Sequence, residues 1–130
     1  MSGLSHIGVA VKDIEASKKT WETLGFVCEH EGVVEEQKVK VAKMVYNGLV
    51  VELLEPTSDD SPIAKYMEKK GQGIHHMCIE VADVPEKISE FQTKEIIMID
   101  NGPRIGAAGK PIAFVHPKST GGVLLELEQE

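Results

Sequence analysis

Two histidines and two glutamates recur at matching positions in the two halves of the chain. His6 lies in an apolar segment near the N-terminus, and His76 lies in a similar segment 70 residues later. Glu52 and Glu126 each interrupt an apolar run. Imidazole nitrogens and carboxylate oxygens are typical ligands of a divalent metal ion that stays open to a substrate, whereas cysteine-rich sites tend to be structural and closed. The four side chains therefore predict a metal site with two ligands from each half.

The spacing of these residues follows an internal repeat, which is the first feature to seek in a sequence. Sliding residues 4–13 forward by 70 positions superimposes His6 on His76, and residues 48–55 are echoed by residues 122–128. Each half thus opens on a segment with a histidine and closes on an apolar segment with a glutamate. If the halves pack about a pseudo-twofold axis, the four side chains converge.

Each residue taken alone also has a structural explanation. A histidine in an apolar strand is more often a core residue with satisfied hydrogen bonds, and either glutamate could lie on a solvated strand face. However, side chains alternate along a strand, so Glu52 shares its face with Val50 and Leu54. An unpaired carboxylate is costly to bury. The recurrence of both residue types in both halves favours the metal site.

Three further polar residues near these motifs are interpreted as structural or solvated. His75 precedes His76, so in a strand its side chain points to the opposite face of the sheet. His30 is expected on the surface. Glu128 shares the face of Glu126 but lies near the terminus, and we expect it to be solvated.

Length, charge and cysteine content limit the classes of function. A chain of 130 residues predicts one domain. A net charge of −7 argues against nucleic-acid binding, which needs a basic surface. No apolar run approaches a membrane span and no leader is recognised, so we expect a cytoplasmic protein, or one of the mitochondrial matrix if a presequence was removed. Cys28 and Cys78 are expected to be reduced thiols.

Capping and turn residues divide the chain into two modules and a connecting helix. Asp13 predicts the start of a helix, Asn47-Gly48 a hairpin, and Ser61 followed by proline a second helix. Module one covers 4–56, the connecting helix 57–73 and module two 74–130. In module two we expect strands over 74–81, 96–99, 111–116 and 122–128, with a helix over about 85–94. The fold class is α+β, with two paired βαβββ modules forming a curved mixed sheet around a metal-binding cleft.

Two such modules with one histidine and one carboxylate each resemble the vicinal oxygen chelate superfamily, which includes glyoxalase I, bleomycin-resistance proteins and extradiol dioxygenases. Within that superfamily the chain is similar to the methylmalonyl-CoA epimerases, over nearly all of its length. The segments that carry this similarity are 59–63, 73–76, 109–111 and above all 116–118 with 121–127. The resemblance implies a single vicinal oxygen chelate domain over 1–130.

The activity that the resemblance implies is the interconversion of (R)- and (S)-methylmalonyl-CoA by metal-assisted proton transfer at C2. The implied metal ligands are His6, Glu52, His76 and Glu126. Co²⁺ is the metal most associated with the family, and Mn²⁺, Zn²⁺ and Ni²⁺ are the other candidates. The implied partners are an acyl-CoA substrate and a second copy of the chain in a homodimer, with no nucleic acid and no membrane.

The sequence departs from the family at one important position. Several members have glutamine at the position of Glu52 and a separate catalytic glutamate on the neighbouring strand, where this chain has Val41. Valine cannot move a proton. We therefore expect Glu52 and Glu126 to serve as the two catalytic bases, with Lys43 as an alternative for the second base.

Basic residues of the second half are candidates for binding the CoA portion. Lys118, Arg104 and Lys110 form the only basic concentration near the expected mouth of the site, and Lys118 is the best single choice because it adjoins the end of a strand. Each of them could also be a solvated loop charge. His116 ends the same strand and is favoured as a group on the substrate side.

Two other functions fit the same residues. A glyoxalase I-like isomerase acting on a glutathione hemithioacetal would share the metal and both bases. A non-catalytic small-molecule-binding protein of the bleomycin-resistance type would typically lack the metal ligands. Assays of substrate turnover and metal binding separate these alternatives.

Overall fold

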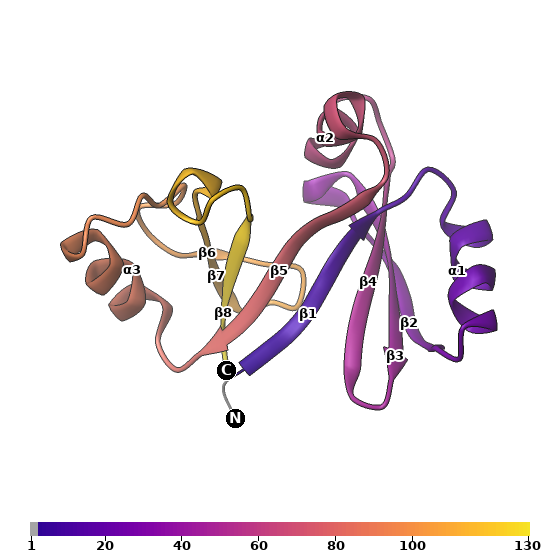
Figure 1. The fold of residues 1–130 in the computed structure, drawn as a ribbon, viewed down its shortest axis with the longest axis horizontal. Coiled ribbons are helices and arrows are strands. Elements are labelled where there is room, and N and C mark those ends of the chain that lie inside the picture. Colours follow the sequence, from indigo (N-terminus) through magenta and orange to yellow (C-terminus); the bar gives the residue numbers. More distant parts are fainter. Residues whose placement is uncertain (1–2) are drawn as a thin grey trace. The chain divides into compact units, whose positions relative to one another are not determined.

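The fold consists of two compact units, each built on four strands. The structure is a computed structural model that describes residues 3–130. One unit is His6–His75, and the other is His76–Glu130 with residues 3–5. Both units follow the order strand, helix, strand, strand, strand, which confirms the two βαβββ modules (Figure 1).

The first unit contains a mixed sheet in the order β2-β3-β4-β1. β1 and β4 are parallel, and the other neighbouring pairs are antiparallel. The connecting helix belongs to this unit. Its elements are β1 (Gly3–Ala10), α1 (Ile14–Thr23), β2 (Val27–Val34), the short helix η1 (Glu35–Gln37), β3 (Val39–Tyr46), β4 (Leu49–Pro56) and α2 (Pro62–Lys70).

Capping and turn residues act in this unit as the sequence predicts. The side chain of Asp13 accepts a hydrogen bond of 3.1 Å from the main-chain N–H of Ala16 at the start of α1. Ser61 caps α2 in the same way, with proline at the first helical position. Asn47 and Gly48 both have positive φ, 45° and 85°, as the tight turn between β3 and β4 requires.

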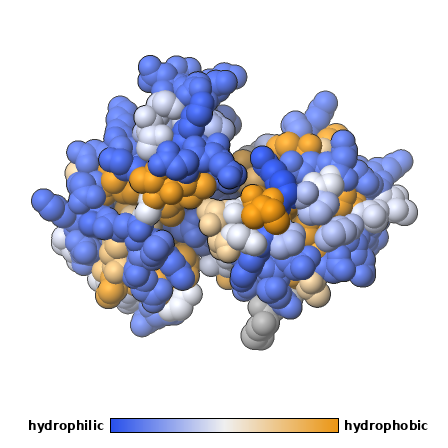
Figure 2. All heavy atoms as spheres, turned by 180° about the vertical axis from the view of Figure 1, so that it is seen from behind, coloured by the Kyte–Doolittle hydropathy of each residue, from blue (hydrophilic) through white to orange (hydrophobic). Residues whose placement is uncertain are grey.

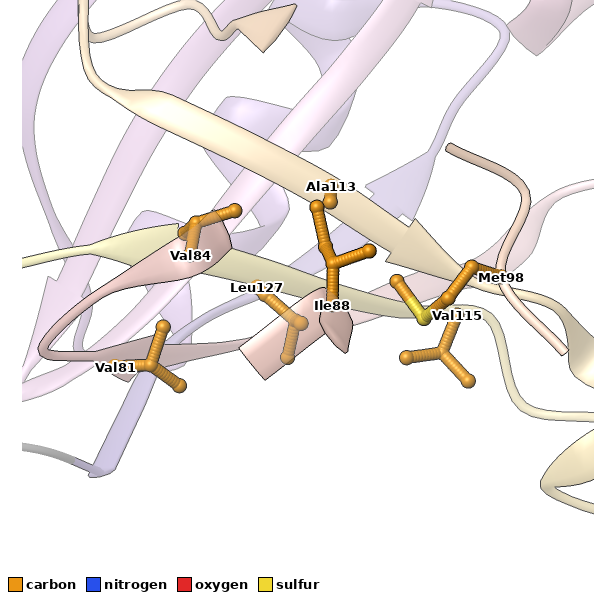
Figure 3. Close-up of a cluster of buried hydrophobic side chains, with 7 residues drawn as sticks. All are labelled: Val81, Val84, Ile88, Met98, Ala113, Val115 and Leu127. Carbon is orange, nitrogen blue, oxygen red and sulfur yellow. The ribbon is translucent and has the colours of Figure 1, made fainter. Parts of the chain in front are cut away.

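The second unit contains a sheet in the order β5-β8-β7-β6, with β5 parallel to β8. The helix α3 packs Val84 and Ile88 onto buried strand residues that include Leu127 and Val115, as Figure 3 shows. The elements of this unit are β5 (Gly73–Val81), α3 (Val84–Thr93), β6 (Arg104–Ile105), β7 (Pro111–Val115), the short helix η2 (Pro117–Ser119) and β8 (Leu125–Gln129).

Two predicted strands of the second unit need correction. Residues 96–99 form only an isolated bridge, between Met98 and Val115, and the paired strand is instead β6 at 104–105. Side chains interrupt the expected ladder, because the Asp100 carboxylate accepts from the N–H of Phe114 at 2.8 Å. The last strand begins at Leu125 rather than at residue 122. Ile96 and Met98 of this run pack against the core, Ile97 and Ile99 are exposed, and the run forms no regular strand.

The two faces of each sheet have different neighbours. In the first unit, α1 covers the face that carries Leu53, and α2 packs on the opposite face beside Leu54. Strand alternation and register place His6 and Glu52 on the face away from α1. In the second unit, His76 and Glu126 likewise lie on the face away from α3. Each histidine–glutamate pair thus lies on the sheet face opposite α1 or α3, and in the first unit α2 covers part of that same face.

Large apolar side chains at the surface are scattered. Most of the surface seen in Figure 2 is hydrophilic, with hydrophobic side chains exposed in places. The most exposed are Leu24, Val27, Ile74 and Ile105, at 63% to 66% of their full area. Isolated exposed residues of this kind are normal. Over residues 3–130, the helices are all too short or too polar to cross a bilayer.

We predict that Leu127→Ala destabilises the second unit strongly. Leu127 is fully buried in the core beneath α3, so the substitution should lower the free energy of unfolding by about 2–5 kcal/mol in urea denaturation. Val123→Ala is the control, because Val123 is 44% exposed. A loss below about 1 kcal/mol for Leu127→Ala would contradict the described packing.

We also predict an unusually acidic Asp60 in the loop before α2. The Lys38 ammonium, and then the Ser58 hydroxyl, bind its carboxylate and lower its pKa from 3.8 to about 2. The stabilisation is therefore complete above the ordinary pKa and is lost as the pH falls toward 2. An NMR titration should show the Asp60 carboxyl near pH 2, and its pKa should rise toward 3.8 in Lys38→Met.

Candidate functional site

The first candidate pair joins β1 and β4 within the unit His6–His75. His6 Nε2 lies 3.5 Å from Glu52 Oε1. The parallel register pairs Gly8 with Glu52, so His6, two residues earlier on β1, shares the glutamate's face. The His6 side chain is buried, whereas 25% of the Glu52 side chain is exposed. The structure thus brings His6 and Glu52 together within this unit.

The second candidate pair joins β5 and β8 in the other unit. His76 Nε2 lies 3.1 Å from Glu126 Oε1. Both side chains are nearly buried, at 8% and 10% exposure. A carboxylate this deep needs a partner, and the imidazole supplies it. The geometry repeats that of the first unit, since β5 and β8 are parallel neighbours, as β1 and β4 are.

Each pair has the spacing of two ligands of one metal ion. Two donors that each lie about 2.0–2.2 Å from an ion, at an angle of about 90–110°, are about 2.8–3.6 Å apart. The measured separations of 3.5 Å and 3.1 Å fall within that range. The donors are imidazole nitrogen and carboxylate oxygen, which suit a transition metal such as cobalt, manganese, zinc or nickel. Each pair therefore has the donor types and the spacing of two ligands of a divalent ion.

Cys78 is a neighbour of the second pair that the sequence interpretation left as a buried thiol. It is fully buried, and in the register of β5 and β8 it lies directly opposite Glu126. The ligand atoms of these two residues lie within 4.8 Å of each other. The signal was present in the sequence, because Cys78 follows His76 by two residues and therefore shares its face.

Arg104 contacts an aromatic ring that packs against His76. Its guanidinium Cζ is 5.2 Å from the centre of the Phe114 ring, and its Nε is 3.3 Å from Asp100 Oδ1. The Phe114 ring in turn packs edge-on to His76, with ring centres 6.1 Å apart. Phe114 is the register partner of Glu126 on β7. The Phe114 ring therefore contacts the Arg104 cation and also His76 of the second pair.

His116 and Lys118 form a local cap at η2. The Nδ1 atom of His116 accepts a hydrogen bond of 2.9 Å from the main-chain N–H of Lys118. Because Nδ1 is the acceptor, the proton of the neutral ring lies on Nε2, which is available as a donor. Both residues are exposed. Lys110, the remaining basic candidate, is exposed in the loop between β6 and β7.

Val41 and Lys43 of β3 have different neighbours. Val41 packs against the apolar cluster beneath α2, which contains Leu54 and Ile63. Lys43 is the register partner of Glu52, and directly opposite residues share a face. The structure thus brings Lys43 to the first pair, and the valine serves packing.

The other histidines and Glu128 lie outside the two pairs. The His75 ring packs edge-on against Tyr66, with ring centres 4.8 Å apart, which agrees with a structural role. His30 is exposed. Glu128 was expected to be solvated, but it is half-buried and accepts a hydrogen bond of 3.1 Å from the Ser5 hydroxyl. That expectation was wrong because the sequence does not reveal the neighbour on the N-terminal segment.

Comparisons with known proteins agree with this geometry. A family profile described as the glyoxalase/bleomycin resistance protein/dioxygenase superfamily matches residues 5–114. The uncharacterized protein YqjC of Bacillus subtilis is 42% identical over 128 residues, which cover 98% of this chain and 91% of that protein. The mitochondrial methylmalonyl-CoA epimerase of Mus musculus is 38% identical over 128 residues, covering 97% of this chain and 72% of that protein.

A solved structure extends the likeness to three dimensions. A methylmalonyl-CoA epimerase of Streptomyces coelicolor, in complex with 2-nitronate-propionyl-CoA, superimposes with a TM-score of 0.90 at 36% identity, covering 98% of this chain and 94% of that one. The profile, the relatives and the structure confirm the resemblance seen in the sequence. The chain belongs to the glyoxalase/bleomycin resistance protein/dioxygenase superfamily and, within it, to the enzyme family of the methylmalonyl-CoA epimerases.

Proposed function

We propose that the protein is an epimerase that interconverts (R)- and (S)-methylmalonyl-CoA by proton transfer at C2. The observation that carries the proposal is the recurrence of a histidine–glutamate pair in both units, at 3.5 Å and 3.1 Å, in a chain 38% identical to a methylmalonyl-CoA epimerase. The C2 proton of this substrate lies between a thioester and a carboxylate, so a carboxylate base can remove it once the developing negative charge is stabilised.

The four paired side chains are the proposed holders of one divalent ion. His6 and Glu52 contribute from the first unit, and His76 and Glu126 from the second. Co²⁺ is the first candidate, and Mn²⁺, Zn²⁺ and Ni²⁺ also suit nitrogen and oxygen donors. Such an ion supplies a Lewis acid for the oxygens next to C2. The histidines orient the two carboxylates, which do the proton chemistry.

Glu52 and Glu126 are the proposed bases, one for each face of C2. Inversion needs removal of the proton on one face and its return on the other, and a single base would favour return to the same face. Val41 cannot serve, because it is part of an apolar cluster. General-base catalysis of this kind contributes roughly 100- to 10,000-fold to the rate. The glutamate that receives the proton from one enantiomer donates it in the reverse reaction.

Basic groups of the second unit are the proposed contacts of the CoA portion. Arg104 stacks on Phe114, whose ring also packs against His76. His116 Nε2 and the Lys118 ammonium present donors at η2, which suit the phosphates of CoA. The homodimer remains a prediction that comes from the resemblance.

The direct test is exchange of the C2 proton with deuterated solvent. Glu52→Gln and Glu126→Gln should each lose one stereochemical half of the exchange and lower the epimerisation rate at least about 100-fold. Glu128→Gln is the control, because Glu128 lies on the same strand face but is hydrogen bonded to Ser5. Full epimerisation by Glu52→Gln would remove Glu52 from the mechanism. Conversion of a glutathione hemithioacetal without any C2 exchange would favour the glyoxalase I-like activity instead.

Metal binding should be visible as a change in thermal stability. At about 100 times its Kd, Co²⁺ should raise the Tm of the wild-type protein by about 10 °C. His6→Ala and His76→Ala should each remove most of this rise, whereas His30→Ala, which changes an exposed histidine, should keep it. An undiminished rise in both ligand variants would place the ion elsewhere, and no rise in the wild type would favour the non-catalytic alternative.

A further inference from the structure

Lys43 stands directly across from Glu52 on the neighbouring strand. The antiparallel register of β3 and β4 pairs the two residues. The Cβ atoms of such partners are about 4.5–5.5 Å apart, and their side chains project from the same face. That face also carries His6. The lysine side chain therefore starts within reach of the His6–Glu52 pair.

The surroundings of Lys43 include carboxylates on both neighbouring strands. Its Nζ lies 3.5 Å from Glu29 Oε1, and 42% of its side chain is exposed. Glu29 is at a register shift in β2, after which His30 becomes the partner of Lys43. Bulges of this kind redirect side chains and are frequent beside active sites. Carboxylates thus stand on both neighbouring strands, and the side chain is in contact with water.

An ammonium ion cannot act as a general base. Lysines that do so lose their proton in apolar surroundings without a carboxylate partner. The surroundings of Lys43 are polar instead, since Glu29 and Glu52 lie on the two neighbouring strands. The structure therefore argues against Lys43 as the second base and leaves it the role of a fixed cation.

Lys43 is also distinctive among the basic residues of its sheet. The four strands of this sheet contain only two lysines, Lys40 and Lys43, and no arginine. Lys40 lies on the opposite face, with its Nζ 3.7 Å from Glu55 Oε2. Lys43 is thus the one Lys or Arg that the strands present on the Glu52 face in the first unit.

We propose that the ammonium group of Lys43 binds the free carboxylate of the acyl group and makes the site selective for acyl-CoA substrates that carry a carboxylate at C2. This inference rests on the proposed epimerase function. An anionic head group that approaches Glu52 meets like charge, in a chain whose net charge is −7. A cation beside Glu52 offsets that repulsion and adds a charge-assisted hydrogen bond. Lys43 transfers no proton in this scheme.

Two ligands that differ only in the carboxylate test the inference. Calorimetric titration of the metal-loaded protein with methylmalonyl-CoA and with propionyl-CoA should show that Lys43→Met weakens binding of methylmalonyl-CoA about 10- to 100-fold and leaves propionyl-CoA unchanged. Lys40→Met is the matched control, because it removes a lysine of similar exposure and pairing from the other face of the same strand. It should change neither affinity.

Each contrary outcome has a distinct meaning. Equal weakening of both ligands, or no weakening of either, would overturn the carboxylate role of Lys43. Loss of one stereochemical half of the C2 exchange in Lys43→Met, with unchanged affinity, would make it the base and likewise overturn the inference. Failure of the wild-type protein to exchange the C2 proton would instead refute the proposed function, so the two failures can be told apart.

Discussion

The structure depends on the pairing of one imidazole with one carboxylate across two parallel strands in each unit. Glu52 and Glu126 interrupt apolar strands whose other residues build the cores, and a carboxylate in such a place is costly unless it has a partner. The parallel pairs β1–β4 and β5–β8 put a histidine within 3.5 Å and 3.1 Å of each glutamate. Each histidine offsets the free-energy cost of burying its carboxylate partner, and it also places a second possible ligand atom beside that carboxylate.

The two units share their order of strands, but their histidine–glutamate pairs have different neighbouring residues. The pair in the first unit is more open, with Glu52 25% exposed and Lys43 opposite it. The pair in the second unit is more deeply buried, with Cys78 opposite Glu126 and with Phe114, which also contacts Arg104, packed against His76. In the proposed function the two units have different roles in binding the substrate. We propose that Lys43 of the first unit binds the charged acyl group and that basic groups of the second unit contact CoA.

The sequence predicted those features that depend on local signals or on the repeat. Asp13, Ser61 and Asn47-Gly48 carry their own capping and turn chemistry, and the 70-residue repeat identified the histidines and glutamates. The features that the sequence did not predict depend on contacts between segments that are far apart in the sequence. The run 96–99 has the composition of a strand, but the Asp100 side chain takes a main-chain donor of β7. The roles of Lys43 and Glu128 also required register and neighbours that spacing along the chain does not reveal.

We propose that His6, Glu52, His76 and Glu126 are ligands of a single ion. Crystals of the cobalt-loaded protein, measured on both sides of the cobalt absorption edge, would locate every bound ion directly. The account predicts one anomalous peak per chain, with donor atoms of His6, Glu52, His76 and Glu126 about 2.0–2.2 Å away. Two peaks per chain, each on a single pair, or one peak remote from these residues, would contradict it.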